Sequence, residues 1–171
     1  MSRAFVKEPD GDQAESDLPE RPQSEHPNYI TSNGLQRMKS TVEMLRQERD
    51  QLKKEDGISA KNRIKAVEAE LRYLEKRLQC AIPVDVSKQV SEEIRFGATV
   101  KLVDENVRKY IFTIVGEDET EPDEGFISWI SPLARALVGK KIHDAVIWER
   151  PAGNLELKIL EFIYKNSNSG V

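Results

Sequence analysis

In two stretches of the chain, apolar side chains recur at alternating intervals of three and four residues, with Arg49 as the one polar exception. The first ladder is Leu35, Met38, Val42, Leu45, Arg49 and Leu52, and the second is Ile64, Val67, Leu71, Leu74, Leu78 and Ala81. This spacing is typical of the seam of a coiled coil. Only a short turn separates the ladders, so the chain must double back. Residues 30–82 are therefore predicted to form an antiparallel coiled-coil hairpin, with arms of about 33–38 Å at about 1.5 Å per residue.

Polar and special residues mark where the two helices should begin and end. Thr31 or Ser32 can cap the first helix by accepting backbone N–H bonds. That helix should run to about residue 54, where Gly57 can take a positive φ and close it. We expect Ser59 to cap the second helix, which should end near residue 80 because Pro83 cannot continue it.

Beyond a connector over residues 83–93, the apolar period changes from that of a helix to that of a strand. Strands are predicted at 95–103, 107–115, 126–130, 145–149 and 155–164. Ser131 followed by Pro132 is a favoured helix start, so a short helix is expected over 132–138. The phase shifts near Leu160, which predicts a β-bulge. Residues 94–165 should thus form a small α+β domain, an antiparallel sheet of about five strands carrying one short helix.

The two ends of the chain differ from this ordered part. Residues 1–29 are poor in apolar side chains and rich in acidic ones, so we interpret them as a disordered acidic tail. Residues 166–171 are polar and are expected to be frayed. No signal-like N-terminus and no run of 18 apolar residues is present, which predicts a cytoplasmic protein. The single cysteine, Cys80, and the distant His26 and His143 make a disulfide or a zinc site unexpected.

Charge divides the chain into three parts. Residues 1–30 hold seven acidic and three basic side chains, residues 31–82 hold eight and twelve, and residues 83–171 hold fifteen and eleven. A basic hairpin between acidic flanks suits a negatively charged surface or channel. An ordinary solvated coiled-coil face would show similar residues, because Lys, Arg and Glu are good helix formers. Both interpretations stay open.

Several segments together resemble the Gre transcript-cleavage factors. They are FGATV at 96–100, IVGEDE at 114–119, ISWISPLARALVGK at 127–140, PAG at 151–153, the closing Ile163-Tyr164, and YITSNG at 29–34. The resemblance covers about residues 29–165, and the segment around Ser131-Pro132 is its most specific part. It implies an antiparallel coiled coil followed by an FKBP-like domain.

The resemblance also implies a mechanism. In the family, the globular domain docks at the rim of the secondary channel of bacterial RNA polymerase and the hairpin enters the channel. Two acids at the tip help to hold a magnesium ion, so that the polymerase cleaves its own backtracked RNA. By this likeness the chain is an accessory factor without a cofactor of its own, which acts on core RNA polymerase and reaches RNA and DNA indirectly. Because the seam is formed within one chain, no dimer is needed and a monomer is expected. The docking residues would be Ser131 and Pro132 with Ile130 and Arg135, although the family commonly places a polar residue where Ile130 stands.

The tip departs from the family pattern. The family carries an Asp and a Glu separated by two residues and followed by Asn, Ala, an acid and Tyr, whereas residues 54–60 here read KEDGISA. The hairpin is also shorter by about one heptad per arm, or about 10 Å of reach. We therefore expect no efficient stimulation of cleavage, because such chemistry depends on positioning within about 1 Å. Glu55 and Asp56 are either a relocated magnesium-binding pair or a solvated turn.

Two other functions stay open. An FKBP-like fold could catalyse prolyl isomerisation if an open pocket were lined by aromatic residues, and the available ones are Tyr110, Phe112, Phe126, Trp129 and Trp148. Their strand positions equally fit core packing. For Trp129 the choice is between a core residue and an exposed anchor on the docking loop. The short hairpin also resembles the regulator of nucleoside diphosphate kinase, a Gre relative.

Overall fold

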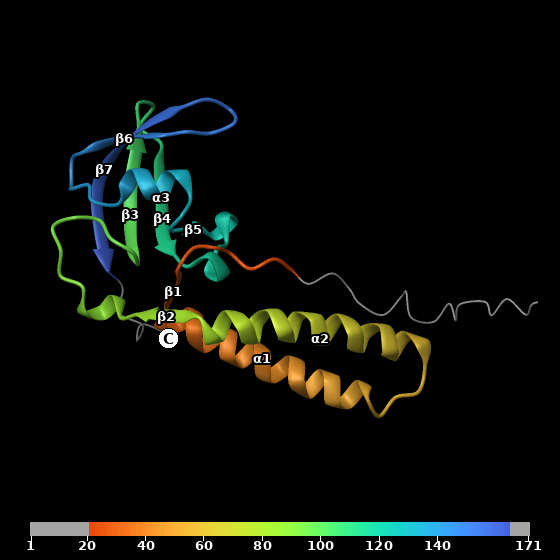
Figure 1. Ribbon diagram of the computed structural model, residues 1–171. Helices are drawn as coiled ribbons and strands as arrows, with labels where there is room; N and C mark the ends of the chain where they lie inside the picture. Colours follow the sequence, from red (N-terminus) through yellow and green to blue (C-terminus); the bar gives the residue numbers. More distant parts are fainter. Residues whose placement is uncertain (1–20, 165–171) are drawn as a thin grey trace, which may run out of the picture.

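The computed structural model describes residues 21–164 as a helical hairpin beneath a small sheet domain (Figure 1). Helices α1 (Ser32–Leu52) and α2 (Ile58–Gln79) lie side by side, and the turn between them is the end of the hairpin farthest from the sheet. Most of the predicted acidic tail and the predicted frayed tail lie outside the described residues. Within 21–164, no helix is long and apolar enough to cross a membrane.

The predicted seam holds the two helices together. Val42, Val67 and Leu71 are buried at its centre, each no more than 4% exposed. Half-buried Leu45, Leu52, Leu74 and Leu78 pack against this cluster. Removal of this apolar surface from water stabilises the pairing, as the sequence pattern predicted. The polar member of the seam, Arg49, forms an ion pair with the neighbouring Asp50 at 2.9 Å.

The helix starts agree with the sequence at one end of the hairpin and differ at the other. Thr31 caps α1, since its hydroxyl oxygen accepts a bond from the Gly34 backbone N–H at 3.0 Å. The prediction that Ser59 caps α2 is wrong. Gly57 occupies the cap position with φ of 152°, a conformation open to glycine, so the helix begins at Ile58 without a side-chain cap.

Two short strands join the open end of the hairpin, and the sequence analysis missed them. β1 (Asn28–Thr31) pairs in parallel with β2 (Ala81–Val84). The predicted boundaries at 29 and 83 are therefore wrong by a few residues: order begins before the tail was expected to end, and β2 extends into the connector. The physical reason is that the antiparallel hairpin brings its two ends together, so their extended backbones can bond each other. The rest of the connector holds a single turn, η1 (Val86–Lys88).

The main sheet has five strands in the order β5-β4-β3-β7-β6. These are β3 (Ala98–Asp104), β4 (Lys109–Val115), β5 (Phe126–Ser128), β6 (Ala145–Trp148) and β7 (Leu155–Tyr164). Three pairs are antiparallel as predicted, but β4 and β5 are parallel. The prediction of a wholly antiparallel sheet is wrong there because residues 116–125 are not a simple hairpin loop. They form two turns, η2 (Glu117–Glu119) and η3 (Pro122–Glu124), that carry the chain back before β5 starts.

Helix α3 (Pro132–Leu137) packs on this sheet and completes its core. Most of the fully buried side chains come from β3, β4, β7 and α3, and Ile94 precedes β3. They include Val100, Leu102, Ile114, Leu137, Leu157 and Ile159. The predicted bulge is confirmed: Lys101 pairs with Glu161 and Leu102 with Ile159, which leaves Leu160 without a partner. The outcome is an α+β molecule, as the sequence indicated.

Candidate functional site

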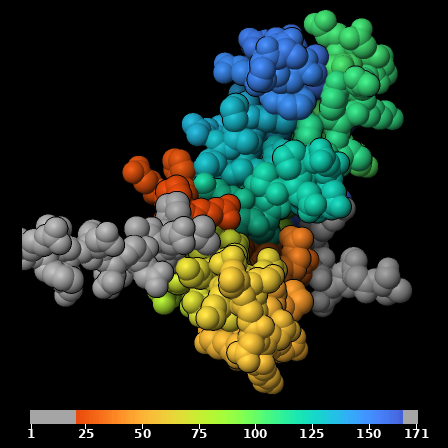
Figure 2. Space-filling view, turned by 90° about the vertical axis from the view of Figure 1, so that its right-hand side faces the viewer, coloured from red at the N-terminus to blue at the C-terminus, as the bar shows by residue number. Residues whose placement is uncertain are grey.

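The predicted site residues lie at two separate places, the turn of the hairpin and the loop that leads into α3. In Figure 1 the turn lies at the right-hand end of the hairpin, whereas α3 lies against the sheet, well away from that turn. Figure 2 shows the hairpin, in orange and yellow, standing below the sheet domain. Any single partner that touches both places must therefore be large.

At the turn, Glu55 and Asp56 are exposed. The backbone around them is held by bonds of the Lys54 and Glu55 N–H groups to the carbonyls of Gln51 and Leu52, at 2.9 and 3.1 Å. No hydrogen bond or ion pair of either carboxylate is found among residues 21–164. Both carboxylates are thus free to meet a partner at the leading end of the hairpin.

These two acids do not form a complete metal site. Within the described part of the chain, no group of three or more His, Cys, Asp or Glu side chains could hold an ion. Magnesium prefers six ligands in octahedral geometry, and two neighbouring carboxylates would supply only part of that set. A magnesium ion at this turn would need further ligands from a partner.

The four predicted docking residues are brought together in one loop and helix start. The Ser131 hydroxyl accepts a bond from the Ala134 N–H at 3.3 Å, with Pro132 at the first helical position. Arg135 folds back so that its Nε donates to the Ile130 carbonyl at 2.7 Å. Pro132 and Arg135 are exposed, whereas Ile130 and Ser131 are half-buried. Their arrangement gives the domain a small, rigid surface element.

Aromatic residues that an isomerase pocket would need are used for packing. Tyr110, Phe112 and Trp148 stack on one another with ring centres 5.4–6.3 Å apart. Trp129 packs against the core and meets the ring of Tyr29 from β1 at 5.1 Å. Of the two interpretations of Trp129, the structure thus favours packing over an exposed anchor. These contacts do not favour a prolyl isomerase.

A cluster of buried charges connects the hairpin to the sheet domain, and we call it the joint: Asn28, Thr31, Gly34, Arg77 and the segment 116–119. Arg77, near the end of α2, is 1% exposed. Its Nε donates to Asp118 Oδ2 at 2.6 Å and its Nη2 donates to Asn28 Oδ1 at 2.6 Å. Glu117 lies 3.6 Å from the same guanidinium. Burial lowers the pKa of Arg77, but the bond and charge of Asp118 raise it, and the net pKa lies above its ordinary value.

Glu119 is the second buried charge of the joint, at 8% exposed. Its carboxylate accepts bonds from the N–H groups of Thr31 and Gly116 at 2.9 and 3.1 Å, and also from the Thr31 hydroxyl. Arg37 on α1 lies 4.0 Å away. One side chain of the sheet domain thus binds the residue that caps α1, which fixes the start of the hairpin against the domain.

Two glycines permit this close approach. A Cβ at Gly34 would lie 2.1 Å from Glu119 Oε1, and a Cβ at Gly116 would lie 2.2 Å from the carbonyl oxygen of Tyr29. Side chains at either position would separate the hairpin from the domain. The joint therefore depends on small residues as much as on charges.

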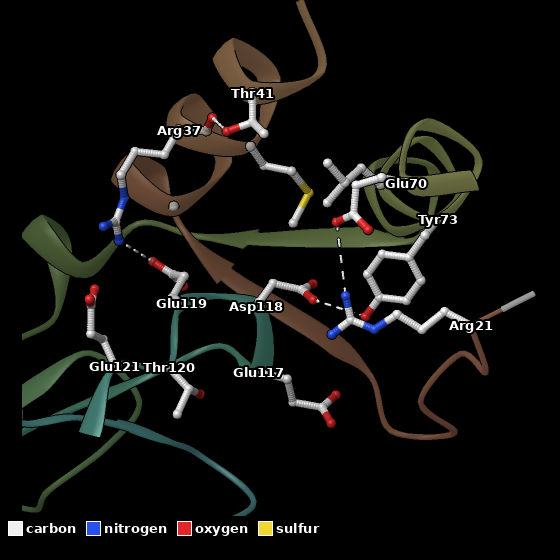
Figure 3. A pocket seen from close by; sticks show the side chains of 13 residues that line it. Arg21, Arg37, Thr41, Glu70, Tyr73, Glu117, Asp118, Glu119, Thr120 and Glu121 are labelled. Atoms are coloured by element: carbon white, nitrogen blue, oxygen red, sulfur yellow. Dashed lines mark hydrogen bonds and ion pairs between the residues drawn. The ribbon is translucent and has the colours of Figure 1, made fainter. Parts of the chain in front are cut away.

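A cavity of about 400 Å³ lies beside the joint, between α1, α2 and the 116–121 segment (Figure 3). Its polar lining includes Arg21, Arg37, Glu70, Tyr73 and Asp118. The Tyr73 hydroxyl donates to Asp118 at 3.3 Å, and burial, then the negative charge of Asp118, raises the pKa of Tyr73. The cavity thus contains both charge signs, already partly paired.

Sequence analysis missed the joint. It assigned no role to residues 116–125, between two predicted strands, and counted Arg77 only among the twelve basic side chains of residues 31–82. The available signal was the run of acids at 117–119, within a segment whose resemblance to the Gre factors was noted for other reasons. Without the β1–β2 pairing, nothing in the sequence indicates that Arg77 meets that run.

The chain thus belongs to the class of α+β proteins in which an extended helical hairpin is held to a sheet domain by buried ion pairs. Comparison with known proteins gives the family. The model "Transcription elongation factor, GreA/GreB, C-term" matches residues 89–164. Transcription elongation factor GreB of Neisseria meningitidis serogroup B is 33% identical over 157 residues, which cover 82% of this chain and 96% of that one. GreA of Nitratiruptor sp. is 34% identical over 151 residues, covering 80% and 93%.

The chain belongs to the GreA/GreB family of transcription elongation factors. Among solved structures, the GreA factor homolog 1 (Gfh1) of Thermus thermophilus aligns with 22% identity over 81% of this chain and 99% of that one, at a TM-score of 0.40. A score this low supports no argument, so the fold stands on the strands and helices described above. The resemblance noted in the sequence is confirmed at the level of the family.

Proposed function

We propose that this chain is a regulator of transcript elongation that binds core RNA polymerase at its secondary channel. The hairpin would enter the channel, and the sheet domain would dock at the rim through Ile130, Ser131, Pro132 and Arg135. Membership of the Gre family supports the polymerase as partner. The observation that carries the proposal furthest is the joint, since buried ion pairs give the hairpin one direction relative to the docking surface.

The altered tip determines the effect that we propose on the polymerase. Glu55 and Asp56 depart from the sequence pattern at the family's tip, and they lie on a hairpin whose arms are 21 and 22 residues long. At about 1.5 Å per residue these arms reach about 32 Å. Such a factor would occupy the channel, modulate pausing and compete with cleavage factors, but would stimulate cleavage weakly. Any magnesium ion involved would be that of the polymerase active site.

Binding is the first test. The full chain at micromolar concentration should co-purify with bacterial core polymerase, and a Ser131→Arg, Pro132→Glu variant should not. Lys109→Gln, which alters an exposed residue at the start of β4, is the matched control and should bind like the parent. Failure of the unaltered chain to bind at this concentration would contradict the proposal.

Cleavage is the second test and separates the two interpretations of the tip. A stalled elongation complex with backtracked RNA should show little shortening of the transcript when the chain is added. The double variant Glu55→Ala, Asp56→Ala should behave the same way. Strong shortening that disappears in this variant would identify the acids as a relocated catalytic pair and would contradict the proposed weak stimulation.

A further inference from the structure

The outer face of α2 carries a line of exposed basic side chains that the joint and the seam do not use. Lys61, Lys65, Arg72 and Lys76 follow one another at spacings of four, seven and four residues, so they share one face of the helix. We call this line the basic stripe. It covers about 22 Å of helix at about 1.5 Å per residue.

The acidic residues of α2 do not neutralise the stripe. Glu68 pairs with Lys53, Glu70 with Arg21 and Glu75 with Arg46, so each one already binds a base from outside α2. Among residues 21–164, no ion pair is found for Lys61, Arg72 or Lys76. The stripe therefore presents a positive potential to the solvent.

The described N-terminal segment runs beside this stripe, toward the tip. Asn28 lies at the base of α2, where its Nδ2 donates to the Arg77 carbonyl at 2.8 Å. Seven residues earlier, the guanidinium of Arg21 lies 4.1 Å from the ring centre of Tyr73 and 3.9 Å from Glu70 (Figure 3). Arg21 and Gln23 also line a groove of about 330 Å³ with Arg72 and Lys76. Between Asn28 and Arg21 the chain thus runs from the base of α2 to the level of Glu70 and Tyr73.

Residues 8–20, which precede Arg21, have the complementary charge. They contain six acidic residues, Glu8, Asp10, Asp12, Glu15, Asp17 and Glu20, and no base. From Tyr73 to Lys61 the helix covers about 18 Å. An extended chain covers that distance with about six residues at about 3.3 Å each, so thirteen residues are more than sufficient.

We propose that residues 8–20 bind the basic stripe of their own hairpin as an acidic strap. The strap would compete with polyanions, so that nucleic acids met in solution bind the hairpin poorly. A partner with stronger or better placed acidic groups could displace it. This inference concerns the free protein and does not depend on the proposed polymerase binding.

Cross-linking tests where the strap lies. An equal mixture of unlabelled and ¹⁵N-labelled full-length chain is treated with a zero-length carbodiimide, which joins carboxylates to lysines. The expected products link residues 8–20 to Lys61, Lys65 or Lys76 within one isotopic species, and their yield falls at 0.5 M salt. Equal yields at Lys109 and Lys158 on the sheet domain, or no links to α2, would overturn the proposal. Links between isotopic species would assign the stripe to a second copy and would also overturn it.

A binding measurement tests the competition. Changing the six acids of residues 8–20 to their amides should tighten binding to random-sequence single-stranded DNA at low salt by about tenfold or more. The same amide changes should have no effect when Lys61, Arg72 and Lys76 are already Gln. Lys39→Gln, Lys109→Gln, Lys158→Gln is the matched control background, in which the tightening should persist. If the amide changes leave the affinity of the parent chain unaltered, the strap does not exist.

Discussion

At the scale of single residues, the joint shows how buried charge can specify one arrangement of two parts. Arg77 comes from the hairpin and Asp118 from the sheet domain, and each would be costly to bury alone. For Glu119 the roles are exchanged: the sheet domain supplies the buried charge, and Thr31 at the start of the hairpin supplies the hydrogen-bond donors. Other packings of the hairpin against the domain would leave these groups unpaired.

Removal of Arg77 should therefore be costly. Arg77→Met keeps the length of the side chain but leaves Asp118 and Glu117 without their cation, and we expect a loss of about 3 kcal/mol in the free energy of unfolding. Urea unfolding measures it. Arg46→Met, which breaks the exposed pair with Glu75, should cost much less, because solvent screens that pair. Equal losses for the two variants would contradict the role given to the joint.

Gly116 allows a separate test of close approach. Its φ of −66° is open to any residue, so only the contact of a new Cβ with the Tyr29 carbonyl matters. Gly116→Ala should destabilise the protein by about 1–3 kcal/mol. Asp123→Ala, an exposed position in the same segment, should change the free energy of unfolding by less than about 0.5 kcal/mol. A neutral Gly116→Ala would show that β1 does not approach η2 as closely as described.

Asp104, in the turn between β3 and β4, should make the free energy of unfolding depend on pH in the acidic range. Burial raises its pKa, but bonds donated by the Arg108 and Asn106 N–H groups and the Tyr110 hydroxyl lower it, and the net pKa lies below the ordinary value of 3.8. A depressed folded-state pKa contributes stability above the unfolded value and loses it as the pH falls through the folded one.

Asp104→Asn should accordingly be less stable than the parent chain at pH 7. The gap should narrow below about pH 3.8, because protonation of Asp104 then removes the same interactions from the parent chain. Urea unfolding of both proteins at pH 7 and pH 3 measures the gap. A gap that is constant across this range would mean that the carboxylate charge does not hold the turn.

At the scale of elements, the sequence predicted those helices and strands whose apolar residues recur at a regular interval. Both hairpin helices, the strand β7, the bulge at Leu160 and the start of α3 at Pro132 follow from local spacing and local cap chemistry. Strands β1 and β2 could not be predicted, since each is four residues long and its partner lies about 50 residues away. The parallel placement of β5 depends on the turns at 117–124, whose geometry no local pattern specifies.

The candidate site divides in the same way. The docking loop at 130–135 could be found because its serine-proline start is a local signal that the family shares. The joint could not, because Arg77 and Asp118 are 41 residues apart and meet only once β1 has paired with β2. Long-range pairing of charges leaves no periodic trace in a sequence.

Truncation of a buried side chain in the hairpin seam should destabilise the protein. Leu71 is 4% exposed within the seam, so Leu71→Ala should cost about 2–4 kcal/mol through lost burial and the cavity that remains. Ile58→Ala, at a position 80% exposed near the tip, should cost under about 0.5 kcal/mol. Helix content by circular dichroism during urea unfolding distinguishes them. Similar midpoints for both variants would contradict a packed seam.

At the scale of the whole molecule, the joint sets the position of the hairpin tip relative to the α3 loop. The tip lies far from the α3 loop, and the joint fixes the direction from one to the other. A partner that holds the loop thereby determines where the tip points. The proposed function as an elongation regulator depends on this fixed geometry between the docking loop and the tip. Glu55 and Asp56 only modify the effect of the tip once it lies in the polymerase.

Locating the tip inside the polymerase tests this account most directly. A photoreactive amino acid is introduced at Ile58, the exposed position after the turn, and the chain is irradiated in complex with core polymerase. We predict cross-links to the polymerase segments that line its secondary channel, and their loss in the Arg77→Met variant. Cross-links confined to the outer surface of the polymerase would contradict insertion of the hairpin into the secondary channel.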